Sequence, residues 1–210
     1  MKQEKIDLSA VKCVVLDLGG VLIDIDYQAT EDAFMGLGLV DFKERYSQLQ
    51  QNSLFDEYEK GQISAQHFIN KLLDFCPQGT TANKVVSAWN AMLGEFPAEK
   101  IALLEQLKNR FPLYMLSNTN DLHIHGVQAA WKRASSAKME DYFKAIFLSF
   151  EIGKRKPDAE TFRWTAEQTG FLPEEILFID DSPQHIEGAK SIGLQTFYYT
   201  DAESFYQLFS

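Results

Sequence analysis

Residues 13–22 read Cys-Val-Val-Leu-Asp-Leu-Gly-Gly-Val-Leu, a short apolar run that ends in an acid and is then broken by two glycines. A continuous apolar run of this kind is typical of a strand that is buried on both faces of a parallel sheet. The glycine pair indicates a turn directly after the strand. The segment therefore predicts a buried strand whose carboxyl end carries Asp17.

Four further apolar runs resemble the first and lie at residues 113–116, 145–148, 176–179 and 196–199. Patterns with helical spacing lie between these runs, over residues 97–110, 157–169 and 183–192, and residues 201–210 predict a short closing helix. Strands that alternate with helices predict an α/β fold. We expect a mostly parallel, Rossmann-like core sheet with helices on both faces.

Residues 27–94 interrupt this alternation, with several stretches of helical periodicity separated by turn signals such as Gly61 and Pro77-Gln78-Gly79. We expect a bundle of about four helices inserted after the first strand. This predicts a helical cap domain over residues 27–94 and an α/β core domain formed by residues 1–26 and 95–210. The expected packing residues of the bundle are Phe34, Leu49, Phe55, Tyr58, Phe68, Leu72, Leu73, Val85 and Trp89.

The composition narrows the function classes. The 210 residues include 20 Lys and Arg and 30 Asp and Glu, and this net charge of −10 argues against nucleic acid or an anionic membrane as a partner. No apolar run approaches the roughly 20 residues that span a bilayer, and the first residues lack a signal-peptide pattern. With two distant cysteines, Cys13 and Cys76, we expect a cytoplasmic protein. A monomer and a homodimer both remain open.

Polar residues stand where three of the predicted strands end. They are Asp17, Ser117-Asn118 and Asp180-Asp181, and the cation cluster Lys154-Arg155-Lys156 precedes a predicted helix. In an open parallel sheet, ligands bind at the carboxyl ends of the strands. Phosphoryl transfer requires a nucleophile in line with phosphorus, and donors and cations around the non-bridging oxygens. The pattern therefore predicts a phosphate site at this edge.

The acids also suit a hard divalent cation, because Mg²⁺ binds one or two carboxylates and keeps several waters. Asp17 could attack phosphorus while its other oxygen binds the metal. Asp181 is the candidate second carboxylate ligand, with Asp180 acting directly or through water, and the backbone carbonyl of Gly19 could complete the set. The alternative for the acid pair is an ordinary helix N-cap, but two adjacent acids favour a bound cation.

The remaining site residues would act on the phosphate itself. Ser117 and Asn118 are candidates to hold phosphate oxygens. One lysine of the 154–156 cluster would neutralise charge and keep Asp17 ionised, and we expect the other two cations of the cluster to be solvated.

Four segments, at residues 16–22, 116–120, 154–158 and 178–182, resemble the four motifs of the haloacid dehalogenase-like (HAD) superfamily, in the expected order. The helical insert after the first strand resembles the C1 type of cap in that superfamily. The first two segments look closest to the branch of bacterial sugar-phosphate phosphatases that includes an α-glucose-1-phosphate phosphatase.

The resemblance implies Mg²⁺-dependent hydrolysis of a small phosphorylated metabolite, such as a hexose phosphate, through an aspartyl-phosphate at Asp17. By the same resemblance, Lys156 is the lysine of the third motif, since Pro157 follows it directly. Ser117 would bind the phosphoryl group with help from Asn118. Asp181 would be the principal acidic metal ligand of the fourth motif, with Asp180 beside it.

Gly19 departs from the pattern of the superfamily, in which most phosphatases carry a second Asp two positions after the nucleophile. That Asp exchanges a proton with the leaving oxygen and with water, which is worth roughly 10²–10⁴-fold in rate. The carbonyl of Gly19 keeps its metal-binding ability, but the general acid is missing. Candidate replacements are Asp24, Asp26, His123, His125, metal-bound water and the substrate itself.

Two other functions are compatible with Gly19. A 2-haloacid dehalogenase uses the same aspartate on carbon, needs no metal and also lacks Asp at this position, but the pair Asp180-Asp181 favours a cation. A non-catalytic protein that binds a phosphorylated ligand is the second alternative. Tyr58, Glu59 and Lys60 either face the site from the cap or are ordinary helix-turn residues, and Trp89 is expected to be a packing residue.

Overall fold

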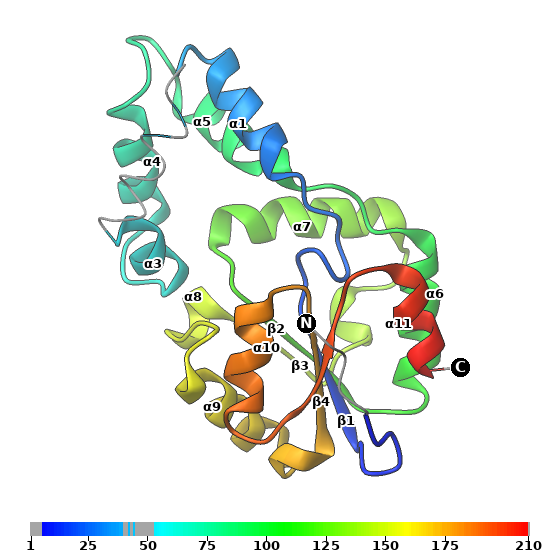
Figure 1. Ribbon diagram of the computed structural model, residues 1–210. Coiled ribbons are helices and arrows are strands. Elements are labelled where there is room, and N and C mark those ends of the chain that lie inside the picture. The colour runs from blue at the N-terminus through cyan, green and yellow to red at the C-terminus, as the bar shows by residue number, and fades with distance from the viewer. Residues whose placement is uncertain (1–5, 40–41, 43, 45–52, 210) are drawn as a thin grey trace.

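The computed structural model describes residues 6–39, 42, 44 and 53–209, which form a five-stranded parallel sheet flanked by helices (Figure 1). The strand order is β3-β2-β1-β4-β5, and every pairing is parallel. The strands are β1 (Cys13–Leu16), β2 (Leu113–Ser117), β3 (Ala145–Leu148), β4 (Ile176–Asp180) and β5 (Gln195–Tyr198). All five predicted apolar runs are therefore confirmed as strands, and β1 lies at the centre of the sheet.

Alternate side chains of β1 enter two separate cores, one on each face of the sheet. Val14 and Leu16 pack on one face, and Cys13 and Val15 pack on the other. The first face is covered by α6 (Ala98–Lys108), α7 (Asp121–Ala134) and α11 (Ala202–Phe209), and the second by α9 (Ala159–Thr169) and α10 (Pro183–Lys190). The predicted α/β fold with helices on both faces is confirmed.

Helix α7 was not among the predicted helices. Its buried stripe is narrow and consists mainly of Val127, Ala130 and Trp131, while most of its other residues are polar. The sequence does carry a start signal, because Asn120 caps the helix: its Oδ1 accepts a 2.9 Å hydrogen bond from the backbone N–H of His123. An N-cap is thus a better guide to this helix than hydrophobic spacing.

Residues 27–94 contribute helices that pack around an apolar cluster of their own, to one side of the sheet (Figure 1). The described helices are α1 (Tyr27–Gly36), α3 (Leu54–Glu59), α4 (Ala65–Leu73) and α5 (Ala82–Trp89). Of the expected packing residues, Leu49 lies outside the described residues. The others belong to the cluster, with Phe55 and Leu73 only partly buried. None of the described helices has the length and apolar character that a bilayer span requires.

The two connections between this helical insert and the sheet run side by side. The N–H of Asp24 donates to the carbonyl of Glu95 at 3.2 Å, and the N–H of Gly94 donates to the carbonyl of Asp24 at 2.9 Å. A third bond of 2.9 Å joins the N–H of Asp26 to the carbonyl of Met92. These bonds tie the insert to the carboxyl-end side of the sheet through two chain segments.

At Gly188, α10 lies close against the chain before α9. A Cβ atom at this position would overlap the carbonyl oxygen of Pro157 and lie 2.8 Å from the ring of Phe162. A backbone oxygen cannot turn away as a flexible side chain can, so the residues next to Lys156 would have to shift.

We predict that Gly188→Ala lowers the free energy of unfolding by about 1–3 kcal/mol, the usual cost of overpacking. The matched control is Gly36→Ala in α1, where a Cβ meets no described atom within 4 Å. That change should raise the free energy of unfolding by up to about 1 kcal/mol, because alanine is the better helix former. Urea unfolding of both variants measures the two values, and equal effects would contradict the close packing at Gly188.

Candidate active site

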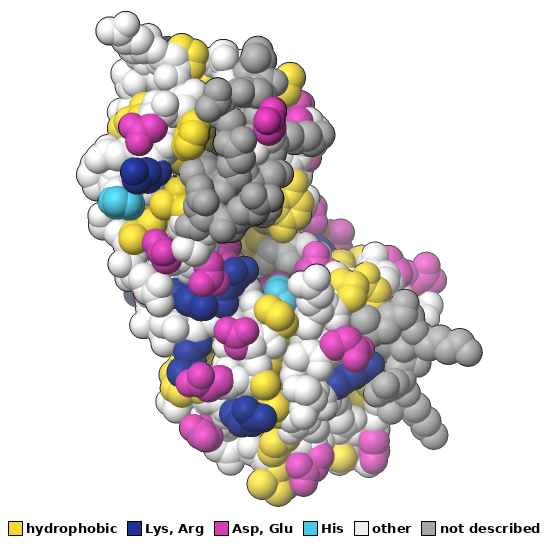
Figure 2. Space-filling model, turned by 60° about the vertical axis from the view of Figure 1, so that its left-hand side comes forward, with side chains coloured by type: hydrophobic (Ala, Val, Ile, Leu, Met, Phe, Trp, Pro, Cys, Tyr) yellow, Lys and Arg dark blue, Asp and Glu magenta, His cyan; other side chains and the backbone are white. Residues whose placement is uncertain are grey.

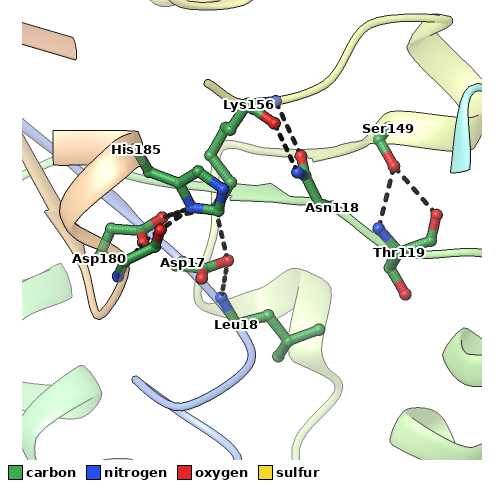
Figure 3. A network of polar contacts seen from close by, with 9 residues as sticks. Asp17, Leu18, Asn118, Thr119, Ser149, Lys156, Asp180 and His185 are labelled. Atoms are coloured by element: carbon green, nitrogen blue, oxygen red, sulfur yellow. Dashed lines mark hydrogen bonds and ion pairs between the residues drawn. The ribbon is translucent and has the colours of Figure 1, made fainter. Parts of the chain in front are cut away.

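The carboxyl ends of β1, β2 and β4 bring the predicted site residues to one edge of the sheet. Asp17 follows β1 directly, Ser117 is the last residue of β2, and Asp180 is the last residue of β4. Because β1 lies between β2 and β4, residues separated by more than 160 positions in the sequence become neighbours. The carboxylates of Asp17 and Asp180 lie on either side of the ammonium of Lys156 (Figure 3).

The ammonium group of Lys156 has no exposed surface, and both its ion pairs are short. Nζ lies 2.8 Å from Oδ1 of Asp17 and 2.6 Å from Oδ2 of Asp180. Burial alone would lower the pKa of Lys156, but the two carboxylates outweigh burial and raise it above its usual value. Lys156 is therefore a fixed positive charge between the first and fourth strands.

Asp180 receives more hydrogen bonds than Asp17. Its Oδ1 accepts from the backbone N–H of Ser182 at 2.8 Å and from Nδ1 of His185 at 2.9 Å, while Oδ2 accepts from Lys156. Burial raises the pKa of Asp180, but Lys156 and His185 more than offset this, so its pKa lies below the usual value. The pKa of Asp17 is raised, first by burial and then by the neighbouring Asp180, despite the opposing effect of Lys156. The excess negative charge is thus least well compensated at Asp17.

A third carboxylate lies beside the loop that follows Asp17. A Cβ atom on Gly20 would overlap Oδ2 of Asp181, so Asp181 reaches this loop, and Gly20 also has a φ of +74° that favours glycine. Asp181 is exposed to solvent. Asp181 thus adds a third carboxylate near the two that pair with Lys156, an arrangement that suits an added cation.

The donor set fits Mg²⁺, which prefers carboxylate and carbonyl oxygens. Within the described part of the chain, Asp17, Asp180 and His185 each place one candidate ligand atom within 4.8 Å of the others. Both oxygens of Asp180 already accept hydrogen bonds from nitrogen donors. Asp17, Asp181 and the carbonyl of Gly19 are therefore the better direct ligands, with Asp180 acting as their hydrogen-bonded support.

The side chain of Asn118 holds the backbone of Lys156. Its Nδ2 donates to the carbonyl of Lys156 at 2.8 Å, and its Oδ1 accepts from the N–H of Lys156 at 2.9 Å (Figure 3). Next to it, the hydroxyl of Ser149 donates to the carbonyl of Thr119 at 3.0 Å and accepts from its N–H at 2.9 Å. The geometry gives the Asn118 amide a positioning role toward Lys156.

A cavity of about 320 Å³ lies between this edge of the sheet and the helical insert. The sheet part supplies residues that follow β1 and β2, and the insert supplies residues of α3 and α5. The lining includes Leu18, Gly19, Ser117, Asn118, Thr119 and His123 from the sheet part, and Tyr27, Phe55, Asp56, Glu59 and Trp89 from the insert. The loop that follows Asp17 thus lines a partly open cavity between two parts of the chain.

Arg155 joins the two walls of the cavity. Its Nη1 donates to Oδ1 of Asp56 at 2.9 Å, and its Nη2 lies 2.9 Å from Oε2 of Glu59. Figure 2 shows basic and acidic side chains gathered where the insert meets the sheet part. The prediction of a solvated Arg155 is therefore wrong, because the acids of α3 draw it into the cavity wall. Lys154 pairs with Glu160 at the protein surface.

The three candidates at the end of α3 have different positions. Glu59 lines the cavity. The hydroxyl of Tyr58 donates to the carboxylate of Asp121 at the start of α7, which makes a second link between the insert and the sheet part. Lys60 forms an ion pair of 2.9 Å with Asp56.

The side chains that could replace a general acid at Gly19 lie in different places in the fold, and most of them are away from the cavity. Asp24 pairs with Lys100 at 3.1 Å, and Asp26 caps α1 by accepting from two backbone N–H groups. His125 is exposed. Of the four side chains, His123 is the one that lines the cavity.

His123 is buried and stacked on Trp89, with ring centroids 4.9 Å apart. The amide of Asn90 donates through Nδ2 to the carbonyl of Leu122, so its Oδ1 faces His123 and accepts from Nδ1 at 2.8 Å. Nδ1 therefore carries the proton in the neutral ring, and Nε2 is an acceptor. Burial lowers the pKa of His123 from 6.5 to about 4.

Sequence reasoning missed His185 and Ser149, which orient the site without touching its centre. His185 stands in the first turn of α10, three residues after Ser182, and a histidine so close to an acid pair was a usable signal. Ser149 gave no such signal, because its partner Thr119 lies 30 residues away in the sequence.

Comparisons with known proteins agree with this geometry. A model of the haloacid dehalogenase-like hydrolase family matches residues 11–193. The D-ribitol-5-phosphate phosphatase of Bacteroides thetaiotaomicron is 32% identical over 187 residues, which cover 89% of this chain and 91% of that protein.

Solved structures are similar over almost the whole chain. The crystal structure of a HAD family enzyme from Bacteroides thetaiotaomicron has a TM-score of 0.89 at 32% identity, covering 95% of this chain and 98% of that chain. A structure of the wild-type enzyme in complex with magnesium and inorganic phosphate has a TM-score of 0.87 at 33% identity, covering 95% of this chain and 100% of that chain.

The low pKa of His123 predicts a pH dependence of stability. The unfolded chain binds a proton at this histidine near pH 6.5, whereas the folded protein does so near pH 4. Protons therefore favour unfolding, and the free energy of unfolding should fall as the pH drops from 6.5 to 4, by about 3 kcal/mol for this group.

The His123→Asn variant keeps a donor for Asn90 but does not titrate. The free energy of unfolding is measured in urea for both proteins between pH 4 and 8. The difference between wild type and variant at each pH removes the contribution of the carboxylates, which the two proteins share. A flat difference profile would contradict a buried, neutral His123.

Proposed function

The chain belongs to the haloacid dehalogenase-like hydrolase family, and we propose that it is a Mg²⁺-dependent phosphatase that hydrolyses a small phosphorylated metabolite through an aspartyl-phosphate at Asp17. The observation that carries this proposal is the buried Lys156 shared by Asp17 and Asp180, directly beside a partly open cavity. In this proposal the protein is a phosphoric monoester hydrolase.

The carboxylate of Asp17 is oriented for attack. Its Oδ1 accepts from Lys156 at 2.8 Å and from the backbone N–H of Leu18 at 2.7 Å, which together fix the plane of the group. Asp17 attacks phosphorus, the ester oxygen leaves and takes up a proton, and water then hydrolyses the aspartyl-phosphate to phosphate and free Asp17. Ser117 and Lys156 hold the non-bridging oxygens and balance their charge.

Mg²⁺ would be held by Asp17, the carbonyl of Gly19 and Asp181, with Asp180 as hydrogen-bonded support. When bound, the ion draws negative charge from the phosphoryl oxygens and compensates the three clustered carboxylates. The raised pKa of Asp17 is consistent with this need for a further positive charge.

The substrate is a sugar phosphate or polyol phosphate in this proposal, with hexose phosphates in the same class. Support comes from the relative named for D-ribitol 5-phosphate and from the solved relative that binds magnesium and inorganic phosphate. Residues 27–94 act as a cap domain over a core of residues 1–26 and 95–210, and the cap excludes water from the reacting phosphate.

The three carboxylates favour a bound metal cation. A 2-haloacid dehalogenase uses no metal, so the site favours phosphate chemistry. Action in the cytoplasm stays a prediction from the sequence, as does the choice between a monomer and a homodimer.

We predict that Asp17→Asn abolishes Mg²⁺-dependent hydrolysis of every phosphate ester that the wild type accepts, because the amide is a far weaker nucleophile. Acid quenching of wild-type turnover, followed by mass spectrometry, should locate a phosphoryl group in a peptide that contains Asp17. Residual turnover in the variant would overturn the nucleophile assignment. A beryllium fluoride complex at Asp17 without hydrolysis of any substrate would instead favour a phosphate-binding protein.

Gly19 offers a test of the missing general acid. A Cβ atom at this position would lie 3.4 Å from Cγ1 of Ile25, an ordinary contact, and the φ angle of Gly19 does not require glycine. We predict that Gly19→Asp raises kcat for an alkyl phosphate by up to about 10²-fold. Hydrolysis of p-nitrophenyl phosphate should change much less, because its leaving group needs no proton.

Gly19→Asn is the matched control for this gain, since it fills the same space without supplying an acid. Steady-state kinetics of both variants on both esters give the comparison. Equal rates for the two variants would mean that another group already provides the proton.

A further inference from the structure

Two buried N–H groups of residues that line the cavity make no hydrogen bond to any described residue. They are Nε1 of Trp89 and Nε of Arg155. Oε2 of Glu59 is also buried and pairs with Nη2 of Arg155 at 2.9 Å, and its remaining lone pairs can accept from a ligand. Leaving a buried donor unpaired is unfavourable, and packing alone does not explain why two of them lie beside one cavity. A ligand that fills the cavity would pair them.

The charges around these atoms are already balanced. Arg155 forms ion pairs with Asp56 and Glu59, and Lys60 forms one with Asp56. Two cations thus face two carboxylates at this end of the cavity. The part of the ligand that lies here is therefore best uncharged, since an added anion would meet two carboxylates without a spare cation.

Four polar groups of the cavity lining include both hydrogen-bond donors and acceptors. Glu59 offers a carboxylate oxygen as an acceptor, and His123 offers Nε2 as an acceptor because Asn90 fixes the proton on Nδ1. Trp89 and Arg155 offer N–H donors. A hydroxyl group both donates and accepts one hydrogen bond, so a chain of adjacent hydroxyls can satisfy all four.

We propose that four side chains of the cavity bind adjacent hydroxyl groups of the substrate and so select a polyol or sugar that carries a single phosphate. This hydroxyl-binding set consists of Glu59, Trp89, His123 and Arg155. The proposal rests on the phosphatase function above, with the phosphate at Asp17 and the carbon chain extending toward α3 and α5. An alkyl chain would leave the N–H groups of Trp89 and Arg155 unpaired, and a carboxylate or second phosphate would face the lone pairs of Glu59 and His123.

A pair of substrates tests the role of the hydroxyls. A linear pentitol 5-phosphate and n-pentyl phosphate have the same chain length and the same phosphate, but only the first has hydroxyls. We expect the wild type to prefer the pentitol phosphate in kcat/KM by at least about 100-fold, because a site built to hydrogen-bond a hydroxyl rejects the analogue that lacks it. A preference below about threefold would overturn the proposal.

Two variants assign the preference to the hydroxyl-binding set. Trp89→Phe keeps the aromatic packing and removes the N–H, and Glu59→Gln keeps the shape and removes the charge. Each should lower kcat/KM for the pentitol phosphate by about 10-fold and leave n-pentyl phosphate within about twofold. An equal loss on both substrates would mean that these residues serve the structure rather than selection.

Glu57→Gln is the matched control on the same helix. Its carboxylate bonds to the hydroxyl of Ser53, and Glu57 is not among the residues that line the cavity. We expect its substrate preference to equal that of the wild type. Loss of the preference in this variant would show that any charge change on α3 suffices, and this would contradict the assignment.

A binding measurement separates this proposal from the phosphatase function. In the Asp17→Asn variant, titration with the pentitol phosphate should change tryptophan fluorescence at a concentration at least 10-fold lower than titration with n-pentyl phosphate. The same titration of the Asp17→Asn, Trp89→Phe double variant should lose most of that difference. If wild type hydrolyses no ester, the phosphatase function fails, and this titration still decides whether the cavity recognises hydroxyls. Equal binding of both ligands would overturn the hydroxyl-binding set.

Discussion

The site depends on the burial of one ammonium group between two carboxylates. Lys156 has no exposed surface, and Asp17 and Asp180 together compensate its buried charge. Those two acids end different strands, and Lys156 follows a third segment that Asn118 holds by two hydrogen bonds. The parallel order of β2, β1 and β4 is thus what brings the parts of the site within reach of each other.

The two carboxylates that share Lys156 have unequal surroundings, and this divides their roles. Asp180 receives further hydrogen bonds from Ser182 and His185, which commit both its oxygens and keep it ionised. Among the described residues, Lys156 is the side chain that bonds to Asp17, and the pKa of Asp17 is raised. Asp180, which receives more hydrogen bonds, fixes Lys156. Asp17 remains available for a metal ion and for attack on phosphorus.

The strands and the residues at their ends could be predicted from the sequence because both follow from the chain's immediate neighbourhood. A doubly buried strand must be continuously apolar, and Asp17 and Asp180 are polar where such runs stop. Helix α7 was not predicted because its buried stripe is narrow. Arg155 was predicted to be solvated because its partners lie almost 100 residues away in α3. Side chains whose direction depends on tertiary packing leave no local pattern.

Arg155 and Lys156 are consecutive, yet their partners lie in different parts of the molecule. Lys156 binds the acids at the sheet edge, whereas Arg155 binds Asp56 and Glu59 of the helical insert. A shift of α3 away from the sheet would break the pairs of Arg155 with Asp56 and Glu59, and one peptide bond joins Arg155 to the lysine. Enclosure of the cavity and orientation of Lys156 therefore depend on the same short segment of chain.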